Sequence, residues 1–127
     1  MQDTSDKKIK EFTDLKAWQE AHSLVLAVYH LTRRFPKGEL FGLTSQMRRA
    51  AVSITSNIAE GFGRRSYKEK IQFYYLTQGS LTELKNQILI ARDVEYMMMP
   101  EYESLAAKAD SAHRLLQGLI TKSKFFL

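Results

Sequence analysis

The sequence contains no cysteine, and only two prolines and six glycines among its 127 residues. The absence of cysteine excludes a disulfide framework, a cysteine nucleophile and a thiolate metal site. An all-β sandwich or barrel needs many tight turns, so the scarcity of glycine and proline argues against one. No apolar run approaches the roughly 20 residues that span a bilayer, and the N-terminus lacks the apolar stretch of a signal peptide. We therefore expect a cytoplasmic protein that does not engage membranes.

The length is that of one domain, long enough to build a hydrophobic core without crosslinks. Hydrophobic residues make up 44% and charged residues 26%, as is typical of a folded soluble protein. The formal net charge is +5, and most of the excess lies in residues 44–70, which carry six Lys/Arg and two Asp/Glu. Such a stretch forms a solvated helix face or attracts a polyanion, and composition alone leaves both readings open.

Hydrophobic periodicity predicts four helices. The first extends from Asp14, a candidate N-cap, to Phe35, since the following proline ends the helix. Its apolar residues cover an arc of about 220°, whereas one core contact needs about 100°. This width indicates either a second apolar neighbour, such as another subunit, or a helix set deeply in its own bundle. The second helix is expected to begin at Thr44 as its cap and to end near Gly61, where a glycine signals a C-terminus.

The third helix is predicted to begin after Ser66, with Glu69 completing a capping box, and to reach about Met97. Its mid-helix Gly79 is unfavourable by about 1 kcal/mol, which close packing of a neighbouring helix would offset. The fourth helix begins at Pro100 or Glu101. Its apolar residues are spaced by alternating intervals of three and four, as in a helix-packing seam: Tyr102, Leu105, Ala109, Ala112, Leu116 and Leu119.

Four helices with short connections predict an all-α, up-down-up-down four-helix bundle. We place the bundle at residues 13–123, after a flexible N-terminal segment at 1–12 and before a C-terminal tail at 124–127. The last three residues of this tail are apolar, which suits either non-specific association or docking on a partner.

Motifs for catalysis or cofactor binding are missing from the sequence. Neither a glycine-rich phosphate loop nor a Gly-x-Ser-x-Gly elbow occurs. Half of a di-iron motif is present as Asp110-x-x-His113, but no second copy exists, and an exposed polar pair is the simpler interpretation. Asn57 is expected to hydrogen-bond across helices, while Glu60 pairs with an arginine. We therefore predict no cofactor, no metal and no enzyme activity.

Basic residues cluster around the turn before the third helix. A helix N-terminus presents free backbone N–H groups and the positive end of the helix dipole, both of which suit a phosphate. Tyr67 lies among these charges and offers a ring on which a base can stack. The candidate nucleic-acid contacts are Arg64, Arg65, Lys68 and Lys70, followed by Arg48 and Arg49, which lie 100° apart on the second helix.

Several runs of residues resemble a known family. They are Asp14-Leu-Lys-Ala-Trp-Gln-Glu-Ala21, Phe35-Pro-Lys-Gly-Glu-Leu-Phe-Gly-Leu43, Gln46-Met-Arg-Arg-Ala-Ala-Val-Ser-Ile54, Asn57-Ile-Ala-Glu-Gly61 and Gly79-Ser-Leu-Thr-Glu-Leu84. Together they are similar to the small bacterial four-helix-bundle proteins called 23S ribosomal RNA intervening-sequence proteins. Thr55 stands where members often have proline, and Asp93-Val-Glu95 replaces a more typical Leu-Gly run.

This resemblance implies a fold and an assembly but no catalytic residues. The family is similar in shape to a basic, pentameric accessory protein of diversity-generating retroelements, which works with a reverse transcriptase and nucleic acid. By that likeness we expect a homopentamer. The predicted function is that of a non-enzymatic, homo-oligomeric bundle that binds RNA or DNA, or a nucleoprotein partner. The rival prediction is a structural or adaptor protein that acts only through protein–protein contacts.

Overall fold

A computed structural model describes residues 8–127 of the chain. Within these residues the protein has four α-helices and two short 3₁₀ turns, and no strand, which confirms the all-α prediction. The helices are α1 (Lys16–Thr32), α2 (Leu43–Gly63), α3 (Tyr67–Asp93) and α4 (Met99–Lys124), and the turns are η2 (Phe12–Asp14) and η3 (Lys37–Glu39).

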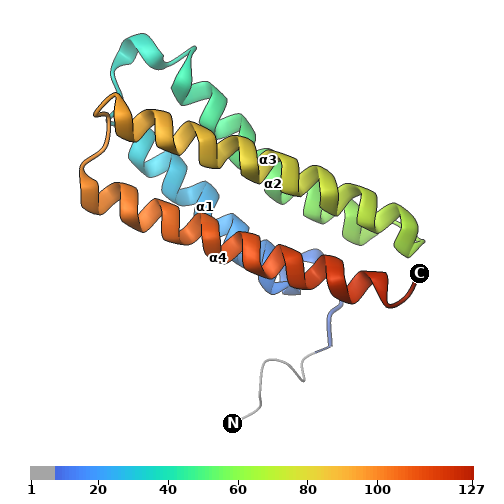
Figure 1. Ribbon diagram of the computed structural model, residues 1–127. Helices are drawn as coiled ribbons and strands as arrows, with labels where there is room; N and C mark the ends of the chain where they lie inside the picture. Colours follow the sequence, from blue (N-terminus) through green and yellow to red (C-terminus); the bar gives the residue numbers. More distant parts are fainter. Residues whose placement is uncertain (1–7) are drawn as a thin grey trace.

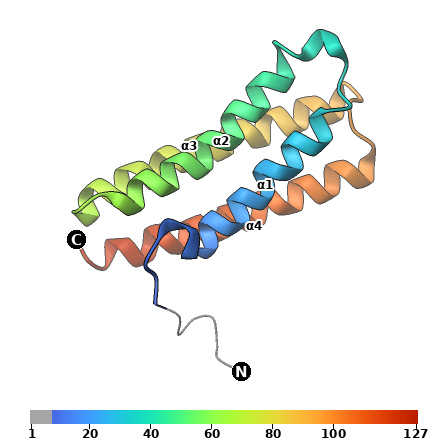
Figure 2. The same cartoon turned by 180° about the vertical axis from the view of Figure 1, so that it is seen from behind.

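The four helices form a closed bundle. Each helix contacts the next along the chain, and α1 contacts α4, so the two diagonal pairs are separated by the core. Successive helices run in opposite directions, and both views place the C-terminus beside the turn that joins α2 to α3 (Figures 1 and 2). None of the helices in the described part of the chain is long and apolar enough to cross a membrane.

The core follows the hydrophobic periodicity of the sequence. Along α4, Leu105, Ala109, Ala112 and Leu116 are almost completely buried, and Tyr102 and Leu119 pack against them at the edge. The wide apolar arc of α1 is covered largely by the bundle itself. Its side chains at Leu26 and Tyr29 nevertheless remain 57% and 37% exposed.

The first two helices begin with caps that differ from the predicted ones. Asp14 does not cap α1, because its carboxylate accepts hydrogen bonds from the backbone N–H groups of Lys10 and Glu11 and closes the η2 turn instead. Leu15 occupies the N-cap of α1, and the helix ends at Thr32 rather than Phe35. A cap requires a particular backbone geometry, and the 3₁₀ turn before α1 places Asp14 one residue too early.

The predicted cap of α2 is also wrong. Thr44 is buried inside the first turn, and Gly42 occupies the N-cap. The carboxylate of Glu39 accepts the N–H of Leu43 at 3.2 Å, so the η3 turn supplies the acceptor that a capping side chain would provide. Tyr96 donates its hydroxyl to the same carboxylate at 2.7 Å, which lowers the pKa of Glu39. The chain between α3 and α4 thereby holds the start of α2.

Helix α3 begins as predicted and ends earlier than predicted. Ser66 is its N-cap, and its hydroxyl accepts the N–H of Glu69 at 3.2 Å. The helix stops at Asp93 because Glu95 adopts a left-handed conformation with φ of 65°. The N–H groups of Glu95 and Tyr96 then bond back to the carbonyls of the last helical turn, as in a Schellman motif.

Close packing between helices occurs at a glycine of α2 and not at Gly79 of α3, where it was predicted. Gly79 is exposed, and a Cβ atom built there meets nothing within 4 Å, so the predicted close packing is absent within the described chain. Gly61 is the site of close approach, because a Cβ there would lie 2.7 Å from the ring of Tyr74.

Candidate nucleic-acid interface

The turn between α2 and α3 exposes three of the predicted cations. Arg64 is the C-cap of α2, and Arg65 leads into the N-cap of α3. Arg65 and Lys68 are exposed and form no ion pair with any residue of the described chain. They lie beside the first N–H groups of a 27-residue helix, which carry partial positive charge. This end of the bundle therefore presents unneutralised positive charge to solvent.

Arg64 is only weakly held in place. Its guanidinium lies 3.6 Å from the carboxylate of Glu60, one helical turn away, and 4.5 Å from the centre of the Phe73 ring. The two side chains of the ion pair are 46% and 61% exposed, so water screens the attraction. The prediction that Glu60 pairs with an arginine is confirmed, and Arg64 remains accessible to an external anion.

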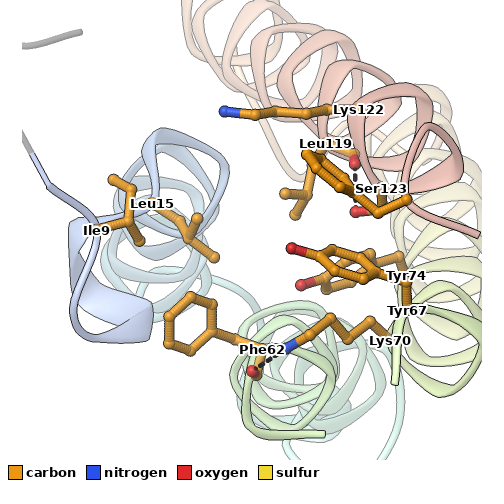
Figure 3. A pocket seen from close by; sticks show the side chains of 10 residues that line it. Ile9, Leu15, Phe62, Tyr67, Lys70, Tyr74, Leu119, Lys122 and Ser123 are labelled. Atoms are coloured by element: carbon orange, nitrogen blue, oxygen red, sulfur yellow. Dashed lines mark hydrogen bonds between the residues drawn. The ribbon is translucent and has the colours of Figure 1, made fainter. Parts of the chain in front are cut away.

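Lys70 points the other way, toward the bundle. Its ammonium group donates a hydrogen bond to the backbone oxygen of Phe62, one of the carbonyls left free at the end of α2. Burial lowers the pKa of Lys70. This side chain caps α2 and lines a cavity at the end of the bundle (Figure 3), whereas Arg65 and Lys68 face solvent.

Tyr67 lies among the cations, but one face of its ring is already covered. The ring stacks on Phe126 from the C-terminal tail, with centroids 4.8 Å apart and an interplanar angle of 22°. The ammonium of Lys70 lies 5.8 Å from the centre of the same ring. A nucleic-acid base that stacks on Tyr67 would therefore compete with Phe126 for that face.

The end of α4 adds two cations that the sequence did not join to this cluster. Lys122 lines the same cavity as Tyr67 and Lys70, and the ammonium of Lys124 lies 5.5 Å from the centre of the Tyr75 ring. The sequence does show both lysines in the last turn of α4, and this was the only sign of additional positive charge there. Only the antiparallel return of α4 brings them beside the start of α3.

Arg48 and Arg49 lie on the other half of α2, about 22 Å along the helix from Arg64 and Arg65. Arg48 bridges two helices, because its Nε donates to the buried hydroxyl of Thr32 at 3.0 Å. Arg49 donates to the side chain of Gln46 at 2.7 Å and stays exposed. The structure thus separates the six predicted cations into two groups.

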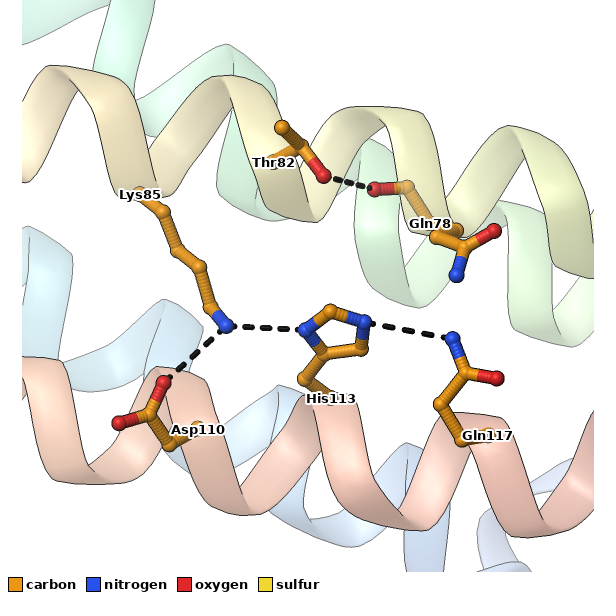
Figure 4. A network of polar contacts seen from close by, with 6 residues as sticks. All are labelled: Gln78, Thr82, Lys85, Asp110, His113 and Gln117. Atoms are coloured by element: carbon orange, nitrogen blue, oxygen red, sulfur yellow. Dashed lines mark hydrogen bonds and ion pairs between the residues drawn. The ribbon is translucent and has the colours of Figure 1, made fainter.

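A lysine side chain lies between Asp110 and His113, the two residues of the half-motif for a metal (Figure 4). The ammonium of Lys85 lies 2.9 Å from Nδ1 of His113 and 3.1 Å from the carboxylate of Asp110, between the two side chains that would ligate a metal. The ammonium of Lys85 can only donate, so Nδ1 is the acceptor of that contact, and Nε2 of the ring lies 3.3 Å from the amide nitrogen of Gln117. Burial and the nearby ammonium lower the pKa of His113.

The polar contact between α2 and α3 uses different residues from those predicted. Asn57 donates to the backbone and hydroxyl oxygens of Ser53 in its own helix, and among residues 8–127 it forms no hydrogen bond to another helix, contrary to the prediction. The interhelical bond joins the hydroxyls of Ser53 and Ser80 at 2.9 Å. Serine on both helices lets the two short side chains reach each other across the α2–α3 contact.

Comparisons with known proteins agree with this fold. A family model described as 23S rRNA-intervening sequence protein matches residues 13–118. A similar solved structure is a protein of unknown function from the S23 ribosomal protein family of Bacteroides thetaiotaomicron, with a TM-score of 0.76 at 19% identity. That match covers 83% of this chain and 95% of the other, and at this identity it bears on the fold alone. No curated protein matches this chain.

Proposed function

This chain belongs to the 23S rRNA-intervening sequence protein family, and we propose that it is a non-enzymatic, homo-oligomeric bundle that binds nucleic acid, RNA in particular. The observation that carries the proposal is the exposed positive charge at the α2–α3 turn. Arg64, Arg65 and Lys68 lie together there. Within residues 8–127 their one ion pair joins Arg64 to Glu60, at 3.6 Å and screened by solvent. Phosphate oxygens replace such weak pairs readily.

The proposed contacts are to the phosphate backbone rather than to bases. Guanidinium groups bind phosphate oxygens through paired N–H donors, and the N-terminus of α3 adds backbone N–H groups. The aromatic ring among these cations, that of Tyr67, has one face covered by Phe126. We therefore expect little sequence preference and a steep dependence of affinity on salt.

The test is a double charge reversal. R64E/R65E is expected to abolish RNA binding in a filter-binding titration, while the circular dichroism spectrum stays unchanged because both side chains are exposed. The matched control is R33E/K37E, which makes the same change in net charge at two exposed residues beyond the far end of α1. Equal loss of affinity in the two variants, or undiminished affinity in R64E/R65E, contradicts the assignment.

Replacing the two arginines by glutamine measures how many phosphate contacts they make. If Arg64 and Arg65 each contact one phosphate, R64Q/R65Q should lower the slope of log affinity against log salt by about 1.4 for single-stranded RNA. A variant that binds less tightly with an unchanged slope would mean that these arginines act through the fold and not through phosphates.

The homo-oligomer is proposed from the apolar surface where α1 and α2 meet. A shallow hollow there is lined by the apolar side chains of Tyr29, Leu40, Phe41 and Val52 and, at its polar side, by Ser45, Arg48 and Arg49; Phe41 is 92% exposed. Exposed apolar clusters of this kind commonly mark protein interfaces. A second copy of the chain is the occupant we favour, because α1 carries an apolar arc wider than its own bundle covers, with Leu26 57% exposed.

Light scattering tests this assembly directly. F41D should dissociate the oligomer, whereas L76D, which alters a 57% exposed leucine on the outer face of α3, should leave the molar mass unchanged. A monomeric wild-type protein would contradict the homo-oligomer. If that monomer also failed to bind RNA, the surface would be better explained by an adaptor function.

A further inference from the structure

A cavity of about 150 Å³ lies at the same end of the bundle as the basic turn, where the segment before α1 meets the end of α2, the start of α3 and the end of α4 (Figure 3). We propose that it binds a small organic monoanion, specifically a carboxylate carried on an apolar or aromatic body. This inference goes beyond nucleic-acid binding and does not depend on it, because the side chains that would hold the carboxylate are not Arg64, Arg65 or Lys68.

The cavity contains hydrogen-bond donors that lack an acceptor. Tyr74 is 2% exposed, yet no residue of the described chain hydrogen-bonds its hydroxyl. Figure 3 shows the hydroxyls of Tyr67 and Tyr74 pointing into the cavity side by side. Both hydroxyls are open to the cavity and can donate to an acceptor bound there. Burial, with the neighbouring Tyr67, raises the pKa of Tyr74 to about 12, which keeps this hydroxyl protonated as a donor.

The charge of the lining selects an anion. Lys122 and Lys70 line the cavity, and no aspartate or glutamate among residues 8–127 does. The ammonium of Lys70 already donates to the oxygen of Phe62. Lys122 forms no ion pair within the described residues and points across the cavity. One free positive charge in the same lining as two hydroxyl donors matches a single carboxylate and disfavours a cation.

The size and walls of the cavity define the rest of the ligand. The remaining lining is mainly apolar, with Leu15, Phe62 and Leu119 on different sides. A cavity of 150 Å³ holds a molecule about the size of benzene. A ring or short branched chain therefore fits together with its carboxylate at the open side, whereas a whole nucleotide does not.

The experiment is a titration of the full-length protein with benzoate, followed by calorimetry and by amide chemical shifts. Saturable binding is expected, with shifts concentrated around Tyr74 and Lys122. Y74F removes only the unpaired hydroxyl, and K122M removes the charge while keeping a side chain of similar length. We expect Y74F to weaken binding by about fivefold and K122M by about tenfold or more, in line with neutral and charge-assisted hydrogen bonds.

The matched control is K124M, two residues away on the same helix and outside the cavity lining. It should leave benzoate affinity unchanged. Benzyl alcohol and inorganic phosphate separate the two parts of the ligand, and each should bind at least about tenfold more weakly than benzoate. The proposal is overturned by non-saturable benzoate binding, by equal losses in K122M and K124M, or by phosphate or benzyl alcohol binding as well as benzoate. R64E/R65E should retain benzoate binding even if RNA binding is lost.

Discussion

Replacing Gly61 by alanine tests a close approach between α2 and α3. A Cβ atom at this position would lie 2.7 Å from Cε1 and 3.1 Å from Cδ1 of Tyr74, and 2.9 Å from Cβ of Phe73. Ordinary contact begins at 3.4 Å, so the nearest pair is short by about 0.7 Å. Tyr74 is 2% exposed, and the Cβ of Phe73 moves only with its backbone. The strain must therefore be relieved by shifting α3 away from α2.

Two opposing effects determine how much a glycine-to-alanine substitution changes the free energy of unfolding. Alanine in a helix is more favourable than glycine by up to about 1 kcal/mol. Overpacking of a well-packed core costs about 1–3 kcal/mol. At Gly79 and Gly118, which are helical and have open space around the added Cβ, only the first effect operates. G79A and G118A should have a higher free energy of unfolding than the wild type. The free energy of unfolding of G61A should be about 1–3 kcal/mol lower than that of these two variants.

Urea unfolding followed by circular dichroism measures these differences. In thermal unfolding they correspond to a spread of about 4–12 °C in Tm, at roughly 4 °C per kcal/mol for a chain of this length. Each variant should be measured at several protein concentrations, because an oligomer gains stability by mass action. If G61A is as stable as G79A at every concentration, the helices do not approach each other as described.

Two other predictions concern local features of the fold. E95G should raise the free energy of unfolding by about 1 kcal/mol, because glycine adopts φ of 65° without strain, whereas E95A should give no gain; urea unfolding of both variants checks this. His113 has a pKa lowered by burial and by Lys85, so between that value and its ordinary 6.5 the unfolded chain binds more protons than the folded one. The free energy of unfolding should therefore rise with pH through this window. The contribution of His113 is fully present above pH 6.5 and is lost as the pH falls through its lowered pKa. Urea midpoints across the window should show this slope in the wild type and in H30Q, and lose it in H113Q.

Much of the fold was predictable because it depends on local patterns. The alternating spacing of apolar residues along α4 identified its buried face, and Ser66 with Glu69 marked the start of α3. These signals work because side chains three or four residues apart share one face of a helix, and because a cap bonds only a few residues away. The end of α3 was missed because Glu95 adopts a left-handed conformation that nothing in its residue type announces.

The candidate sites were predictable only in part. The sequence placed Arg64, Arg65 and Lys68 around one turn, because a turn keeps its neighbours together. It gave no indication that Lys70 turns inward to the carbonyl of Phe62, or that Lys85 comes to lie between Asp110 and His113. Both contacts depend on the rotation of one helix relative to another, which the periodicity of a single helix does not specify.

The sequence by itself determined that this protein is helical, which face of α4 is buried, and where the excess positive charge lies along the chain. Only the tertiary structure decided that the end of α4 returns beside the start of α3. That return places Lys122 and the hydroxyl of Tyr74 around one cavity, 48 residues apart in the chain. Local patterns specify faces, but the pairing of faces depends on how all four helices pack together.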